Sequence, residues 1–264
     1  MISKPLFKRN ISVMWKVYLI ILAVLGMYVS VIVYMYNPEI SDMLVQYQEA
    51  MPQMMSAFGM VGMAQNLLEW MQIYLYGFLM CVFPLIFIII MGQRLIMHYI
   101  DSGSLASLLA TPNTRRKIIL TQLVSCILWI FILLASVTLI GIVACEIMFP
   151  KELDIEKYIY LNLCAFLLQL ALTGIAFFSS CIFSEAKHYY LIGAGIPLLS
   201  FLIQMISNMG EKLENLKYLS IYTLFPAEKI IHGSGGIWKY NLTLAVMAIL
   251  LFAGGSYWFC RRDF

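Results

Sequence analysis

Six apolar segments, each long enough to cross a lipid bilayer, limit how this chain can fold more than any other feature. They comprise residues 17–36, 71–91, 121–145, 160–181, 190–207 and 242–260. A helix needs about 20 mostly apolar residues to cross a bilayer core of about 30 Å. Because lipid offers no hydrogen bonds to the backbone, we expect each segment to be an α-helix. The sequence therefore predicts an all-α integral membrane protein, with residues 1–264 forming one domain of six transmembrane helices.

The composition excludes the main alternatives to a membrane protein. Hydrophobic residues make up 62% of the chain and charged residues 12%, whereas soluble domains average about 45–50% and about 25%. So few charges could not cover a soluble domain, and a disordered chain would need low hydrophobicity. The six cysteines lie in or at the ends of the apolar segments without a Cys-x-x-Cys pair, so we interpret them as small apolar residues. We expect no metal or cofactor on this chain and no nucleic-acid partner.

Charged residues divide unevenly between the two sides of the predicted bundle. The side with both termini and the 92–118 segment carries eleven basic and three acidic residues, and the opposite side six basic and eleven acidic. Cytoplasmic segments are enriched in Lys and Arg, so we expect both termini in the cytoplasm. The 37–69 segment is then an outer loop. Its six methionines lack Cys or His neighbours, which favours an apolar packing surface over a Cu(I) site.

The first 16 residues are basic and amphipathic. Apolar residues recur at helical spacing, and Lys, Arg and Ser occupy the other face; the apolar set is Phe7, Ile11, Met14 and Trp15. This pattern is typical of a helix that lies in the membrane interface before the first span. The alternative is a charged flank that only fixes the orientation of the chain.

The segment between the second and third spans predicts a short helix with an apolar ridge. Asp101 or Ser102 can cap a helix, and Pro112 ends it, because the residue before a proline avoids helical geometry. The ridge consists of Leu105, Leu108 and Leu109, which share one face. Taken alone, this pattern fits either a docking helix for a partner or a helix lying flat on the membrane.

The same segment resembles a motif of ABC-2 type transporter permeases. The motif reads acidic-x-Gly-Ser/Thr-Leu-x-x-Leu-Leu-x-Ser/Thr-Pro-x-Ser/Thr-Arg and lies between the second and third of six spans. It is matched here by Asp101, Gly103, Leu105, Leu108, Leu109, Thr111 and Pro112. Asp101 is a departure, since the family more often has Glu there. The ending Phe-Cys-Arg-Arg-Asp-Phe at 259–264 resembles the tail of many bacterial permeases, so the resemblance extends over the whole chain.

The resemblance implies an ABC-2, type V exporter-like architecture in a bacterial-type plasma membrane. A permease of this family pairs with a second permease chain, identical or a sister, and with two copies of an ABC ATPase that bind ATP and Mg. Residues 101–111 would be the cytoplasmic coupling helix, and residues 1–16 the elbow helix. The residues around 219–231 resemble the short half-inserted helices that cap the outer end of the pathway. The ATPase contacts implied are Asp101, Ser102, Gly103, Leu105, Leu108, Leu109, Thr111 and Pro112.

Motifs and residue types that the sequence lacks reduce the number of function classes that fit it. The chain has no Gly-x-x-x-x-Gly-Lys-Ser/Thr phosphate loop, so it would need a separate ATPase. The central parts of the spans carry no ionisable residue, which removes the usual machinery of ion-coupled transport. No His-Glu-x-x-His or Gly-x-Ser-x-Gly motif accompanies the three histidines, so we do not expect an enzyme.

Uncharged polar residues within the spans allow two interpretations. Gln169, Thr173 and Gln204 either hydrogen-bond between helices or line a translocation surface at a dimer interface. We expect an ATP-driven exporter that moves an amphipathic or hydrophobic substrate out of the cytoplasm. A peptide is favoured over a drug or a lipid. A non-transporting binding, immunity or sensor protein for peptides is the alternative class.

Overall fold

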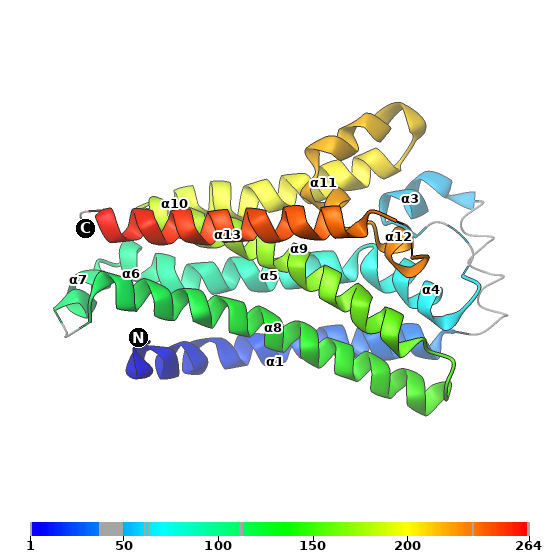
Figure 1. The fold of residues 1–264 in the computed structure, drawn as a ribbon, viewed down its shortest axis with the longest axis horizontal. Helices are drawn as coiled ribbons and strands as arrows, with labels where there is room; N and C mark the ends of the chain where they lie inside the picture. Colours follow the sequence, from blue (N-terminus) through cyan, green and yellow to red (C-terminus); the bar gives the residue numbers. More distant parts are fainter. Residues whose placement is uncertain are drawn as a thin grey trace.

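The computed structural model describes residues 2–36, 50–60, 62, 64–110, 113–233 and 235–262. These residues contain helices and no strand. Six helical segments are long and apolar enough to cross a membrane: Lys4–Tyr34, Leu79–Asp101, Arg115–Met148, Ile155–Ile182, Ala186–Asn208 and Ile237–Arg261. They lie side by side in an elongated bundle with both chain ends at the same end (Figure 1). The prediction of six apolar spans is confirmed.

Four of the spans are single, unbroken helices. These are α1 (Lys4–Tyr34), α8 (Arg115–Met148), α9 (Ile155–Ile182) and α13 (Ile237–Arg261). The second span joins α5 (Leu79–Gly92), η2 (Gln93–Met97) and α6 (His98–Asp101). The fifth joins α10 (Ala186–Tyr189), η3 (Tyr190–Ala194) and α11 (Gly195–Asn208). Both composite spans therefore contain a π-helical turn near the end of the bundle that carries the termini.

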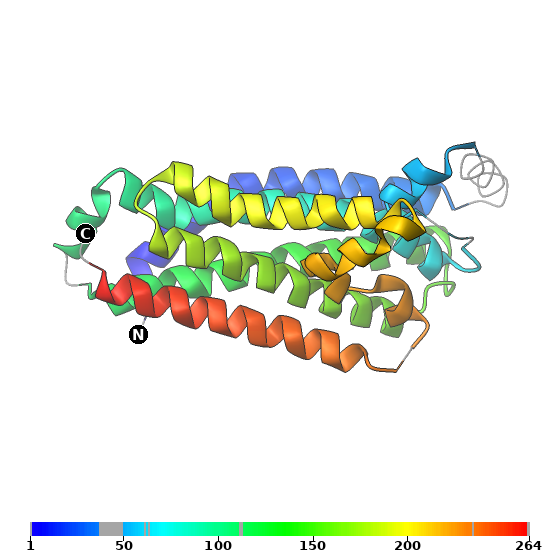
Figure 2. The same cartoon turned by 90° about the horizontal axis from the view of Figure 1, so that it is seen from above.

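The centre of the bundle is α9, which passes behind α13 in Figure 1 and runs between the fifth span and α13 in Figure 2. The most apolar stretch of α9 is 72% buried, against 28% for those of the fifth span (Ala186–Asn208) and of α13. Glycines allow α9 and α13 to approach closely. A Cβ on Gly174 would lie 3.1 Å from Leu251, and one on Gly255 would lie 3.1 Å from the Phe177 ring. Small residues of this kind let transmembrane helices pack by van der Waals contact.

The N-terminal segment continues into the first span without a turn. Of its apolar face, Ile11 and Trp15 are exposed, Phe7 is half-buried and Met14 is buried. Asn10 is also buried, and its Nδ2 donates to Gln122 Oε1 at 2.7 Å and to Ser125 Oγ at 2.8 Å. This polar contact turns the Asn10 face towards α8. The structure thus differs from a separate interfacial helix, and the role of this segment as an elbow stays a prediction.

The second span starts at Leu79, eight residues later than predicted. The apolar residues before it form α4 (Leu67–Met71) and η1 (Gln72–Tyr76). The chain then breaks at Gly77, where a Cβ would collide with the carbonyl oxygen of Phe58 and lie 3.3 Å from the backbone of Gly59. A backbone crossing this close requires glycine, and hydropathy alone does not reveal it.

Short helices cover the end of the bundle opposite the termini (Figure 1). They are α3 (Pro52–Ala57), α4, η4 (Glu211–Leu219), η5 (Ile221–Leu224) and α12 (Ala227–Ile231). The short helices expected around 219–231 are present as η5 and α12. Much of the methionine-rich 37–69 segment lies outside the described residues. Within the described part, Met51 and Met54 are exposed, and Met60 lines an apolar surface cavity with Trp70 and Tyr74.

Candidate functional site

A short helix, α7 (Ser104–Leu109), stands at the same end of the bundle as the chain termini (Figure 1). Asp101 is the last residue of α6 and Ser102 follows it as the C-cap, so neither of the two predicted residues caps α7. Gly103 occupies the cap position with a φ of 68°, a left-handed conformation that favours glycine. Thr111 and Pro112, the last two residues of the predicted contact set, lie outside the described residues. A helix is present here, and its role in coupling stays a prediction.

The apolar ridge of α7 faces mainly its own bundle. Leu105 is buried and packs with residues of the second and third spans and of α13, namely Leu95, Ile96, Tyr99, Ile118, Ile119 and Phe259. Leu108 and Leu109 are half-buried, whereas Ala106 and Ser107 are exposed. Leu105 thus lies within the bundle, and the predicted contact of the leucine ridge with a partner stays a prediction. This leucine holds α7 on the bundle, and the surface open to a partner is the Ala106–Ser107 side.

Asp101 connects the second span to the fifth. Its Oδ1 accepts a hydrogen bond of 3.0 Å from the backbone N–H of Ala186, the first residue of α10. Within the described part of the chain, Ser102 contacts its own segment: its hydroxyl donates to the His98 carbonyl and pairs with the Ser104 hydroxyl. The acidic position of the motif is thus used inside this chain.

The three polar residues predicted to line a translocation surface have different roles. Gln169 is buried and donates from Nε2 to the Met80 carbonyl at 2.9 Å, which ties α9 to α5. Thr173 is buried and donates to the carbonyl of Gln169 within the same helix at 2.7 Å. Gln204 is half-buried and accepts from the Thr223 hydroxyl at 2.8 Å. The first two fit helix packing, and Gln204 belongs to the outer pocket described next.

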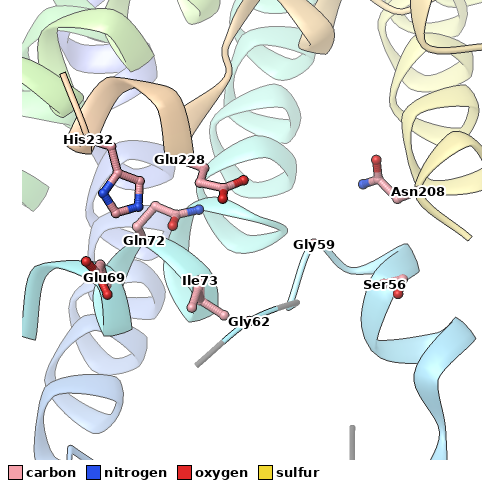
Figure 3. Close-up of a pocket in the computed structure, with 9 residues that line it drawn as sticks. All are labelled: Ser56, Gly59, Gly62, Glu69, Gln72, Ile73, Asn208, Glu228 and His232. Atoms are coloured by element: carbon pink, nitrogen blue, oxygen red, sulfur yellow. The ribbon is translucent and has the colours of Figure 1, made fainter. Parts of the chain in front are cut away.

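A polar pocket of about 300 Å³ opens at the end of the bundle opposite α7. Figure 3 shows Glu228 and Gln72 directed into the same space, with Asn208 facing them from the end of α11. Its lining also includes Ser56, Gly59, Gly62, Glu69, Ile73 and His232. A neighbouring cavity of about 260 Å³ shares Gln72, Asn208 and Glu228, and it reaches Gln204 and the Tyr222 ring. The sequence offered no signal for this pocket, because its lining comes from four separate segments.

Glu69, one of the acidic residues that line this pocket, is held by hydrogen bonds at the start of its own helix. Glu69 caps its own helix: Oε2 accepts from the Gln65 N–H at 2.8 Å, and the Glu69 N–H donates to Asn66 Oδ1 at 2.9 Å. Burial, together with the carboxylates of Glu152 and Glu69, raises the pKa of Tyr36 above its ordinary value. Among the described residues, no group of three or more His, Cys, Asp and Glu side chains could hold a metal ion.

One family of known proteins matches this chain. The family model described as "ABC-2 family transporter protein" matches residues 8–264, which includes α7, all six spans and the short helices of the outer pocket. No curated protein and no solved structure matches the chain.

Proposed function

Because the chain belongs to the ABC-2 family of transporter proteins, we propose that it is the permease subunit of an ATP-driven exporter. Members of this family are multi-pass transport subunits that partner with an ABC ATPase and are not themselves catalytic. The proposal adds a direction, from the cytoplasm outwards, and a docking site for the ATPase.

The observation that carries the proposal is the position and surface of α7. It projects from the end of the bundle that holds both termini, and its Ala106–Ser107 side is exposed. Leu105 fixes it to the second and third spans and to α13. A short helix held in this way can fit a groove on a soluble partner and pass force to the spans behind it. The excess of basic residues on this side supports a cytoplasmic location for α7 and both termini.

The transport unit is proposed to contain two permease chains and two ATPase copies, with ATP and Mg bound on the ATPase. The most apolar stretches of the fifth span and of α13 are only 28% buried within this chain. Apolar helix faces that this chain does not itself cover can pack against lipid or against a second permease chain. The second chain is either another copy of this protein or a sister permease.

The substrate is proposed to be amphipathic or hydrophobic, with a peptide favoured over a drug or a lipid. The middle of each span lacks charged side chains, which suits apolar cargo. The polar pocket around Gln72, Asn208 and Glu228 then offers hydrogen bonds at the outer end. A substrate with both apolar and polar parts would meet suitable surfaces along this route.

Affinity purification of the tagged chain in mild detergent tests the proposal. We expect a protein with a phosphate loop to co-purify with the wild-type chain. The double variant Ala106→Glu/Ser107→Glu places two charges on the exposed side of α7 and should lose this ATPase. Tyr218→Glu is the matched control, since it adds a charge at a residue that is 78% exposed at the other end of the bundle.

Two results would contradict the proposal. Recovery of the chain without any ATPase, across several detergents and lipids, would favour the non-transporting binding or immunity protein. Equal ATPase recovery with the α7 double variant would remove α7 as the docking site.

A further inference from the structure

The start of the fifth span is held by a residue of the second span. Glu185 precedes α10 in an extended conformation and makes no side-chain cap. The backbone N–H of Ala186, which has no intrahelical partner at this position, instead donates to Asp101 Oδ1 at 3.0 Å. The carboxylate thus supplies from another helix the cap that the fifth span does not supply for itself.

A second contact, one turn further along, fixes the same two spans to each other. The Tyr189 hydroxyl donates to the Ile89 carbonyl of α5 at 2.7 Å. The Tyr189 ring lies between glycines of both spans: a Cβ on Gly92 would lie 2.5 Å from its hydroxyl oxygen, and one on Gly193 would lie 2.9 Å from the ring. Asp101 and Tyr189 together make the end of the fifth span follow the end of the second.

We propose that Asp101 is a positioning residue that passes movement of α7 to the fifth span through its hydrogen bond to Ala186. The inference rests on the proposed function, because it takes α7 as the element that the ATPase moves. Only Ser102 and Gly103 separate Asp101 from α7, so a displacement of α7 reaches this carboxylate directly. Asp101 acts through the backbone of the fifth span and does not touch the substrate.

The fifth span is built to carry such a movement to the other end of the molecule. It runs from Ala186 to Asn208, and Asn208 lines the outer pocket. Its apolar window is only 28% buried, so it can shift with less loss of packing than the central α9. The π-helical turn η3 lies directly after α10, and π-helical turns are often found where a helix adjusts at a functional site.

The test measures whether Asn208 responds to ATP in the complex of this chain with its ATPase, held in lipid nanodiscs. An Asn208→Cys substitution is labelled with a water-soluble maleimide, with and without ATP and vanadate. Of the native cysteines, five are buried and Cys260 is half-buried, so their background is measured in the parent complex. The ratio of the two labelling rates reports movement at the outer end of the fifth span.

Two variants remove the Asp101 hydrogen bond from opposite sides. Asp101→Ala removes the acceptor. Ala186→Pro removes the donor at a first helical position, where proline is tolerated, and the extended Glu185 (φ −115°, ψ 138°) suits the residue before a proline. Asp101→Asn keeps the accepting oxygen, and Lys187→Ala changes an exposed neighbour of the donor that lies outside the predicted ATPase contacts.

We expect both disrupting variants to reduce the ATP-dependent change in labelling by about 2- to 10-fold, the range for one hydrogen bond. The response is compared per bound ATPase, and Asp101→Asn and Lys187→Ala should behave like the parent. An undiminished response in Asp101→Ala and Ala186→Pro, with the ATPase still bound, would overturn the inference alone. Failure of the ATPase to bind even the parent chain would overturn the proposed function, and the inference with it.

Discussion

The Arg262 side chain is predicted to hold the end of the bundle that carries α7. Its Nη1 donates to the Ile182 carbonyl at 2.6 Å and to the Cys181 carbonyl at 3.3 Å, and its Nη2 donates to the Ser184 hydroxyl. The two carbonyls lie at the C-terminal end of α9, where helix carbonyls lack intrahelical partners. The Arg262 carbonyl also accepts from the Arg115 guanidinium at the start of α8. One residue thus connects α13, α9 and α8.

Replacing Arg262 by Ala should lower the free energy of unfolding by about 2 kcal/mol. A hydrogen bond to a charged group contributes about 1.5–3 kcal/mol. The guanidinium makes three such contacts, but it is only half-buried and therefore partly screened by solvent. We accordingly expect the value of about one good charged bond rather than three. Arg262→Lys should recover only part of this loss, since an ammonium cannot reproduce the planar fork of the guanidinium.

Unfolding of the purified chain in detergent, followed by heating or by titration with a denaturing detergent, measures the loss. Arg261→Ala is the matched control, because Arg261 is exposed and lies over the Tyr257 ring at 4.5 Å. It removes the same charge from the neighbouring position. Equal stability of the Arg262→Ala and Arg261→Ala chains would refute the proposed link between the three helices.

Two further predictions concern packing and pH. Gly92→Ala should cost about 1–3 kcal/mol by displacing the Tyr189 hydroxyl, and Tyr189→Phe should relieve part of that cost; a double-mutant cycle of unfolding free energies checks both. Asp154 accepts the Lys157 N–H at the start of α9, and this bond lowers the Asp154 pKa below its ordinary value. Its contribution is therefore full above the unfolded pKa and lost as pH falls through the folded pKa. Melting curves in acid should show the wild type losing more stability than Asp154→Asn, which caps without titrating, and identical losses would contradict this.

The spans were predictable from sequence because burial in lipid imposes a long apolar run on each helix. The start of the second span was not, since hydropathy does not register the close backbone crossing at Gly77. The N-terminal segment shows a similar limit. Hydropathy gave no sign that the Asn10 face packs on α8, because that packing depends on the hydrogen bonds of Asn10 to Gln122 and Ser125.

The candidate site was likewise predictable from sequence only in part. A short helix in this segment was predictable from local signals, namely a leucine ridge and a proline, although the predicted cap at Asp101 or Ser102 is replaced by Gly103. The direction of that ridge depends on what packs beneath it, so Leu105 could not be assigned to the bundle from sequence. The outer pocket depends wholly on how distant segments meet, because Gln72, Asn208 and Glu228 come from separate parts of the chain.

The length of α8 affects how the protein stands in its membrane. Its 34 residues extend about 51 Å, and about 48 Å across the membrane at the usual tilt of about 20°. A bilayer with its headgroups is only about 40–45 Å thick. The surplus of a few ångströms must project into water, and the Arg115 end of this helix adjoins α7. A surplus at the Arg115 end would lift α7 clear of the headgroups, where a soluble protein reaches it without displacing lipid.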